Sequence, residues 1–210
     1  MAAIALINLP WLFLNVPYKL FAALALIPCP MILILACMFP EDISLDEKAK
    51  AANGRVELLS PMIFSGMVPC LRLLIDFNIL DWPRLLIFAA VLLVVIFTAL
   101  FYFNKPMRKK IGSLVGVVFL CAFFAVGIIG QLNYLLDFSP PQSQAAQITD
   151  MHISTSSRGP DRYVLTIVMD NGAEMDLQVS KLEYQALTPG DQVTVFILSG
   201  GLGIPYAVVG

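Results

Sequence analysis

The chain has 210 residues, of which 59% are hydrophobic and only 13% are charged, and its mean hydropathy is +0.82. A water-soluble domain of this length cannot bury so much apolar surface, and the apolar residues come in long runs without charge. The composition therefore excludes an ordinary soluble protein and predicts an α-helical, multi-pass membrane protein.

Three runs are long enough to cross a membrane as helices, because about 30 Å of hydrocarbon needs roughly 20 apolar residues. We expect spans at about 20–39, 85–103 and 111–136. Pro28 and Pro30 remove backbone donors from the first run, so we expect that span to be kinked. Residues 1–19 carry no cation before Lys19 and no convincing cleavage site, which favours a short interfacial helix over a cleaved signal.

The segment 61–80 leaves the number of spans open. A helix is expected to begin at Ser60-Pro61, and Arg72 and Asp76 lie one turn apart, where they can pair. A charge at the centre of a span costs about 2.5–3.5 kcal/mol, which favours a helix lying in the interface with its charged face toward water. The alternative is a fourth span with Arg72 and Asp76 facing a partner helix. With three spans the N-terminus is cytoplasmic, and with four it is outside.

The hairpin between the second and third predicted spans indicates the orientation. It runs from Asn104 to Lys110, and its four cations are Lys105, Arg108, Lys109 and Lys110. Short loops rich in Lys and Arg stay on the cytoplasmic side. We therefore interpret these cations as a topology signal rather than a nucleic-acid patch. The chain after the third span then lies outside the cytoplasm, and from Asp137 onward it carries only three basic residues against eight acidic ones.

The composition changes after the last predicted span. We expect a membrane domain at 1–138, a proline-bearing linker at 139–145, and a small β-domain at 146–210. Asn171-Gly172 between two alternating runs indicates a two-residue hairpin, and Ser180 is placed to cap a single helical turn. Five strands and one helical turn predict a small all-β barrel of the OB or SH3 type, with a two-sheet sandwich as the rival.

The sequence shows little sign of chemistry. The four cysteines, Cys29, Cys37, Cys70 and Cys121, all lie in apolar segments without metal or redox spacing. His152 is expected to share a strand face with Asp150, but no nucleophile or metal motif accompanies them. The glycine-rich stretch 199–203 lacks the following helix that a phosphate loop needs. We therefore expect no enzyme, and no catalytic, cofactor-binding or metal-binding site.

These patterns favour a binding or structural role. We expect a multi-pass protein of the cell membrane, with a bacterial inner membrane favoured, that displays a small acidic β-domain outside the cytoplasm to a protein partner. It would serve as an accessory subunit, an immunity-type protein or an envelope sensor. The expected partners are the lipid bilayer and a protein, without nucleic acid, and homo-oligomer formation is left open. The alternative is a transporter or channel component that uses polar residues among its spans.

Overall fold

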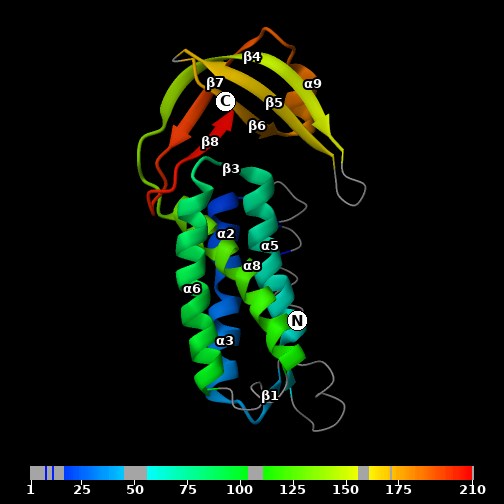
Figure 1. The fold of residues 1–210 in the computed structure, drawn as a ribbon, viewed down its shortest axis with the longest axis vertical. Helices are drawn as coiled ribbons and strands as arrows, with labels where there is room; N and C mark the ends of the chain where they lie inside the picture. Colours follow the sequence, from blue (N-terminus) through cyan, green and yellow to red (C-terminus); the bar gives the residue numbers. More distant parts are fainter. Residues whose placement is uncertain are drawn as a thin grey trace. The chain divides into compact units, whose positions relative to one another are not determined.

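A computed structural model of the protein describes residues 8, 11, 17–44, 56–103, 111–155, 161–170 and 172–209. The chain divides into two compact units. The helical unit contains residues up to 73 and residues 83–135, and the barrel unit contains residues 74–82 and 136–210. The barrel unit therefore takes its residues from two separate stretches of the sequence (Figure 1).

The first membrane-length segment is interrupted at Pro28, as the sequence predicts. Helix α2 covers Tyr18–Leu26 and α3 covers Pro28–Met38, with Ile27 between them. Because Pro28 has no N–H to donate, the Leu24 carbonyl accepts instead from the Ile27 amide at 3.3 Å. The proline thus ends one helix and begins the next within a single apolar segment.

Three longer helices complete the helical unit. They are α5 (Leu59–Asp76), α6 (Trp82–Phe103) and α8 (Ile111–Leu135). Within the described part of the chain, three segments are long and apolar enough to cross a membrane: Tyr18–Met38, Trp82–Phe103 and Val115–Leu135. They coincide with the three spans predicted from the sequence. A two-residue parallel pairing of β1 (Ile43–Ser44) with β2 (Val56–Glu57) lies between α3 and α5 in the chain.

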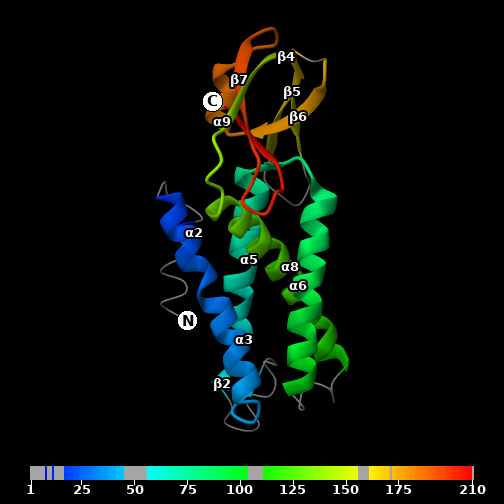
Figure 2. The same cartoon turned by 90° about the vertical axis from the view of Figure 1, so that its left-hand side faces the viewer.

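The helical unit has a core built from four helices, α3, α5, α6 and α8, which run side by side (Figures 1 and 2). Its buried side chains are small or medium in size apart from one phenylalanine. They are Cys29, Ile32, Ala36, Met62, Ile96, Leu100, Val117, Cys121 and Phe124. Since α5 contributes Met62 to this core, α5 is an integral member of the bundle.

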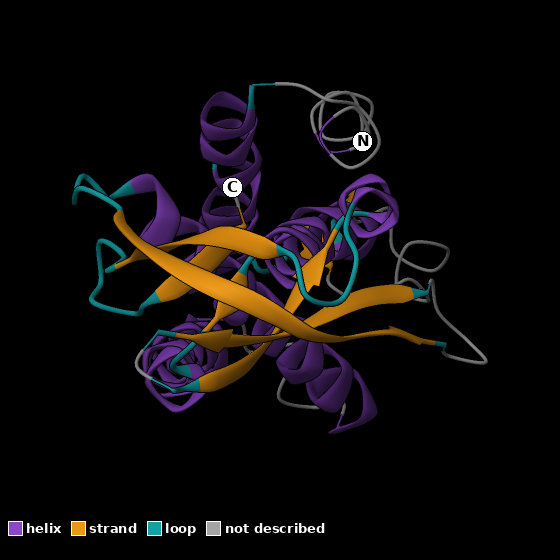
Figure 3. Cartoon of the chain, turned by 90° about the horizontal axis from the view of Figure 1, so that it is seen from above, coloured by secondary structure: helices purple, strands orange, loops and turns teal. Residues whose placement is uncertain are grey.

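The barrel unit is a six-stranded antiparallel sheet that closes almost completely. Its strand order is β3-β8-β7-β4-β5-β6. The strands are β3 (Asn78–Ile79), β4 (Gln142–Ser154), β5 (Arg162–Met169), β6 (Glu174–Val179), β7 (Gln192–Leu198) and β8 (Tyr206–Val209). Figure 3 shows the strands in orange, twisting across one another as a strongly curved sheet requires. The prediction of a helical membrane region followed by a small all-β barrel is confirmed.

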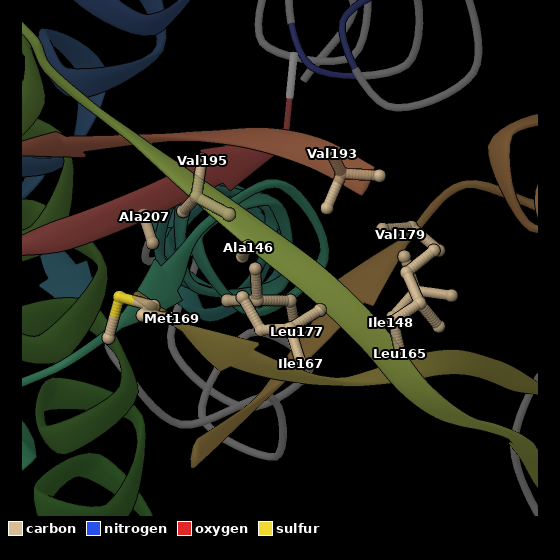
Figure 4. Packing of buried hydrophobic residues seen from close by; sticks show 10 residues of the cluster. All are labelled: Ala146, Ile148, Leu165, Ile167, Met169, Leu177, Val179, Val193, Val195 and Ala207. Atoms are coloured by element: carbon tan, nitrogen blue, oxygen red, sulfur yellow. The ribbon is translucent and has the colours of Figure 1, made fainter. Parts of the chain in front are cut away.

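The barrel interior is filled by alternate residues of the strands, and ten of these side chains are shown in Figure 4. Leu165, Ile167 and Leu177 are fully buried there. A β-bulge at Thr149 shifts the register between Ile148, opposite Ile167, and Asp150, opposite Thr166. The extra residue lets Met151 pack against the core while Asp150 stays exposed.

The hairpin expected at Asn171-Gly172 is present between β5 and β6, but its loop is longer than expected. The Met169 amide donates to the Ala173 carbonyl at 2.9 Å, and the Gly172 amide donates to the Met169 carbonyl at 2.8 Å. The hydrogen bond between Met169 and Ala173 closes a loop of three residues, instead of the two-residue loop expected. Gly172 has a φ of 77°, in the left-handed region that glycine adopts readily. Asn171 lies outside the described residues.

The single helical turn is α9 (Lys181–Ala186). Ser180 caps it in a capping box: its hydroxyl accepts from the Glu183 amide at 3.2 Å, and the Glu183 carboxylate accepts from the Ser180 amide at 2.7 Å. Strand β4 begins at Gln142, inside the stretch expected to be a linker (139–145).

The sixth strand, β3, was not predicted, because it lies in the short connection between α5 and α6. It pairs with β8 at one edge of the sheet, with Asn78 opposite Ala207 and Ile79 opposite Tyr206. The side-chain amide of Asn78 then reaches the strand at the other end of the sheet. It accepts from the Gln178 amide at 2.7 Å and donates to the Gln178 carbonyl at 3.1 Å. The Asn78 side chain therefore pairs like a peptide unit and bridges the gap between β3 and β6.

We predict that Asn78→Ala weakens the barrel at this seam. The substitution removes the two hydrogen bonds to Gln178, each worth about 0.5–1.5 kcal/mol, and a long one of 3.5 Å to the Ala207 carbonyl, so the cost is about 1–3 kcal/mol. Hydrogen exchange of the full-length protein in detergent measures it, and the β6 amides should exchange faster. Asn78→Asp is the comparison variant: it keeps the acceptor for the Gln178 amide but replaces the donor with a carboxylate oxygen beside the Gln178 carbonyl. Unchanged exchange of β6 in Asn78→Ala would contradict the seam.

Candidate functional site

Helix α5 presents an apolar face outward. Its exposed side chains in the helical unit include Phe64, Met67 and Leu71, which are 37–41% exposed. Arg72 is only partly exposed. A helix lying in the interface of a membrane has the opposite arrangement, with its charged side chains outermost. The exposed surface of α5 thus resembles that of a helix surrounded by lipid.

Glycines let α5 and α8 approach closely. A Cβ added at Gly127 would lie 2.7 Å from the Cys70 backbone nitrogen, and one at Gly130 would lie 2.3 Å from the Leu73 side chain. These pairs advance in the same direction along both chains, so the two helices run parallel. Gly112 and Gly116 form a G-x-x-x-G pattern in the same helix, but Gly116 does not take part in this contact, because a Cβ there would meet nothing within 4 Å.

Aromatic rings surround Arg72 in the helical unit. Its guanidinium carbon lies 5.8 Å from the ring centroid of Trp11 and 5.2 Å from that of Tyr18. The Tyr18 ring makes edge contacts with Trp11 at 5.4 Å and with Tyr134 at 5.1 Å. A cation over an aromatic face is stabilised by about 0.5–2 kcal/mol, with the larger values away from water. The rings can therefore stabilise Arg72 where water is scarce.

Gln131 links three segments of the helical unit. Its side chain is fully buried. Its amide Nε2 donates to the Pro69 carbonyl of α5 at 3.1 Å, and the same side chain hydrogen-bonds to the Tyr18 hydroxyl at 3.1–3.2 Å. Asn133 is also buried, at 1% exposed. The burial of these two side chains cannot be recognised from the sequence, because the sequence does not show which face of α8 is covered.

The four cysteines are reduced, and three of them, Cys29, Cys70 and Cys121, are buried in the bundle. In the described part of the chain, no three His, Cys, Asp or Glu side chains lie close enough to hold a metal ion. His152 and Asp150 are both exposed on β4.

Two further sets of residues were singled out in the sequence, the basic hairpin and the pair on α5. The topology signal, Lys105, Arg108, Lys109 and Lys110, lies outside the described residues. Arg72 and Asp76 are both on α5 and partly exposed, and their pairing stays a prediction.

In the barrel unit, sequence reasoning missed Asp137, a buried carboxylate directly after α8. Its Oδ1 accepts from the Ser139 amide at 2.9 Å and the Ser139 hydroxyl at 2.5 Å, and its Oδ2 accepts from the Gly200 amide at 3.0 Å. Burial raises the pKa of Asp137, but these bonds and one from the Tyr206 hydroxyl outweigh it and lower the pKa below its ordinary value. Within the barrel unit, the carboxylate therefore joins the start of the segment 136–139 to the β7–β8 loop.

The glycine-rich stretch that resembles a phosphate loop is the β7–β8 loop, and it wraps the chain around Asp137. A Cβ at Gly201 would lie 2.4 Å from the carbonyl carbon of Leu136, and Gly200 and Gly203 have φ values of 73° and 71°. The anion that this loop binds is a carboxylate of its own chain. The only sequence signal was the spacing of Asp137 and Ser139, which is typical of an Asx turn.

No known protein family, curated protein or solved structure shows significant similarity to the chain. The assignment of a function therefore depends on the geometry of this protein alone.

We predict that Asp137 makes the stability of the barrel depend on pH. Because its pKa is lowered on folding, the ionised carboxylate stabilises the fold above the unfolded pKa of about 3.9, and this contribution is lost as the pH falls through the folded pKa. At pH 7, Asp137→Asn should cost about 1.5–3 kcal/mol, the usual range for hydrogen bonds to a charged group. Denaturant unfolding of the full-length protein in detergent measures this difference.

The difference between wild type and Asp137→Asn should begin to shrink as the pH falls through about 3.9, where the carboxylate of the unfolded chain becomes protonated, and it should be lost below the lower pKa of the folded protein. Asp150→Asn removes one charge from an exposed position of the same barrel and serves as the control. A difference that stays constant down to pH 2 would show that the charge of Asp137 does not stabilise the barrel.

Proposed function

We propose that this chain is a non-enzymatic membrane protein that displays its acidic barrel outside the cytoplasm to a protein partner. The observation that carries the proposal is the construction of the barrel from residues 74–82 and 136–210. Both stretches connect directly to helices, at α5 and α6 for the first and at α8 for the second. A barrel tethered to the helices by three such chain connections suits a displayed binding module.

The shared sheet also supports the crossing of α6 and α8. Because β3 and β8 pair in one barrel, Trp82 and Leu136 belong on the same side of the membrane. The chain between them must then cross an even number of times, which α6 and α8 satisfy. The basic hairpin 104–110 would lie on the opposite side, and its cations favour the cytoplasm for that side.

Helix α5 serves as a fourth span in this proposal. Its 18 residues cover about 27 Å, its outward face is apolar, and it runs parallel to α8 in close contact. The rings of Trp11 and Tyr18 lower the cost of holding Arg72 in the membrane. Four spans would place both termini on the side of the barrel.

The polar side chains of the helical unit favour anchoring over transport. Gln131 hydrogen-bonds to Tyr18 and to the Pro69 carbonyl, and the Ser65 hydroxyl donates to the Pro61 carbonyl of its own helix at 2.6 Å. A transport route needs polar groups that face a water-filled path. The bonds of Gln131 join three helices, and that of Ser65 stays within α5. Because these side chains serve the helical structure, they support the binding role over the transporter alternative.

The charge of the barrel indicates the kind of partner. From Asp137 onward the chain has eight acidic and three basic residues, and most of the acidic side chains are exposed. A basic protein surface would be attracted to such a domain, at a rate that falls with salt.

We predict that a photoreactive benzoylphenylalanine at Leu182 or Ile153 captures a discrete protein in intact cells. These side chains are 80% and 47% exposed on the barrel unit. The same residue at Val94, 63% exposed on α6, is the control and should capture lipid but no discrete protein. Capture at the barrel positions should weaken in high salt. Protein adducts at Val94 alone would contradict display by the barrel.

We predict that a cysteine introduced at Asp42, in a variant of the protein without its four native cysteines, is protected from a membrane-impermeant maleimide in intact cells. Asp42 follows α3 and is exposed, so four spans place it in the cytoplasm and three spans place it outside. A cysteine at Leu182 should react in either case and is the positive control. Labelling of both positions would support the three-span arrangement, and labelling of Asp42→Cys alone would reverse the whole orientation.

A further inference from the structure

An apolar groove runs between α3 and α6 in the helical unit. Its volume is about 500 Å³. The lining side chains are all apolar or weakly polar, and they include Leu33, Cys37, Met38, Val95, Ala99 and Phe103. This volume lies within the range of about 300–1,000 Å³ found for sites that hold small molecules.

The groove has the length of one membrane leaflet. Along α6 it extends from Val95 to Phe103, which is about 12 Å at 1.5 Å per residue. Half of a hydrocarbon core about 30 Å thick is about 15 Å. Met38 and Phe103 are the last residues of their helices, so the groove begins at the end of both helices and stops near the bilayer centre.

These dimensions argue against a transmembrane helix of another protein as the occupant. Such a helix crosses the full core, and its contacts usually include small residues that allow close approach or polar residues that hydrogen-bond. The groove instead offers mostly bulky aliphatic side chains over one leaflet. A flexible hydrocarbon chain lying along the helices fits both its length and its lining.

The sequence after Phe103 indicates the headgroup. Four cations follow within seven residues, whereas Glu41 and Asp42 follow Met38 on the other helix. The excess of positive charge favours an anionic headgroup in that leaflet. We propose that the groove between α3 and α6 binds an acyl chain of an anionic phospholipid from the leaflet at the Phe103 end of α6.

The lipid site goes beyond the display of the barrel, and it rests on α3 and α6 crossing the bilayer in the same direction, as in the four-span arrangement of the proposed function, so that Met38 and Phe103 lie at the same leaflet. It is tested by native mass spectrometry of the full-length protein, purified in mild detergent and supplied with phosphatidylglycerol. Wild type should retain one phosphatidylglycerol per chain. Ala99→Phe fills the groove and should weaken retention about tenfold, equivalent to about 1.4 kcal/mol.

Ala90→Phe makes the same change at an exposed position of α6 that does not line the groove, and it should retain the lipid. Equal retention by Ala99→Phe and Ala90→Phe would overturn the site. Retention of phosphatidylcholine as strong as that of phosphatidylglycerol would also overturn it, because the proposal specifies an anionic lipid.

A second measurement uses the unmodified protein and does not depend on the folding of a variant. Vesicles of phosphatidylglycerol with a diazirine in the acyl chain are irradiated with the reconstituted full-length protein. Crosslinks should concentrate several-fold on the groove residues Cys37 and Ala99, relative to Ile87 and Val94, which are 65% and 63% exposed on α6. Crosslinks spread evenly over these four positions would overturn the proposal.

Discussion

The barrel depends on the pairing of β3, a two-residue strand in the connection between α5 and α6. An open sheet edge exposes unpaired N–H and C=O groups and invites pairing with other chains. Here β3 covers the edge of β8, and the Asn78 side chain covers part of the edge of β6. Without this segment the C-terminal sequence would form a sheet of five strands with two open edges. The barrel is therefore complete only when the connection between two helices takes part in it.

The same requirement, that polar groups find partners, governs the helical unit. Gln131 is buried among apolar helices, and its amide bonds to a tyrosine hydroxyl and a backbone carbonyl. Arg72 lies over two aromatic rings. In a low-dielectric environment such groups are costly unless satisfied, and once satisfied they specify one packing of the helices. A bundle of this kind suits a stable anchor, which agrees with the display role proposed for the barrel.

The candidate site residues show where reasoning from the sequence stops. Arg72 is conspicuous because a cation in an apolar helix is rare, yet its surroundings, Trp11 and Tyr18, come from a distant part of the chain. Asp137 attracted no attention as a ligand, since its long-range partner Gly200 lies 63 residues away. The glycines of the 199–203 stretch suggested an anion loop, and only the fold identifies the bound anion as the carboxylate of Asp137.

The sequence by itself determined the features that depend on neighbouring residues. These are the three apolar segments, the break at Pro28, the glycine turn at Gly172 and the capping box of Ser180, all of which follow from local sterics and hydrogen bonds. The tertiary structure decided what depends on residues far apart. Strand β3 is too short to show a pattern, and it exists because β8 supplies its partners. The burial of Gln131 and the close approach at Gly127 likewise follow from the packing of α5 against α8, which no local pattern encodes.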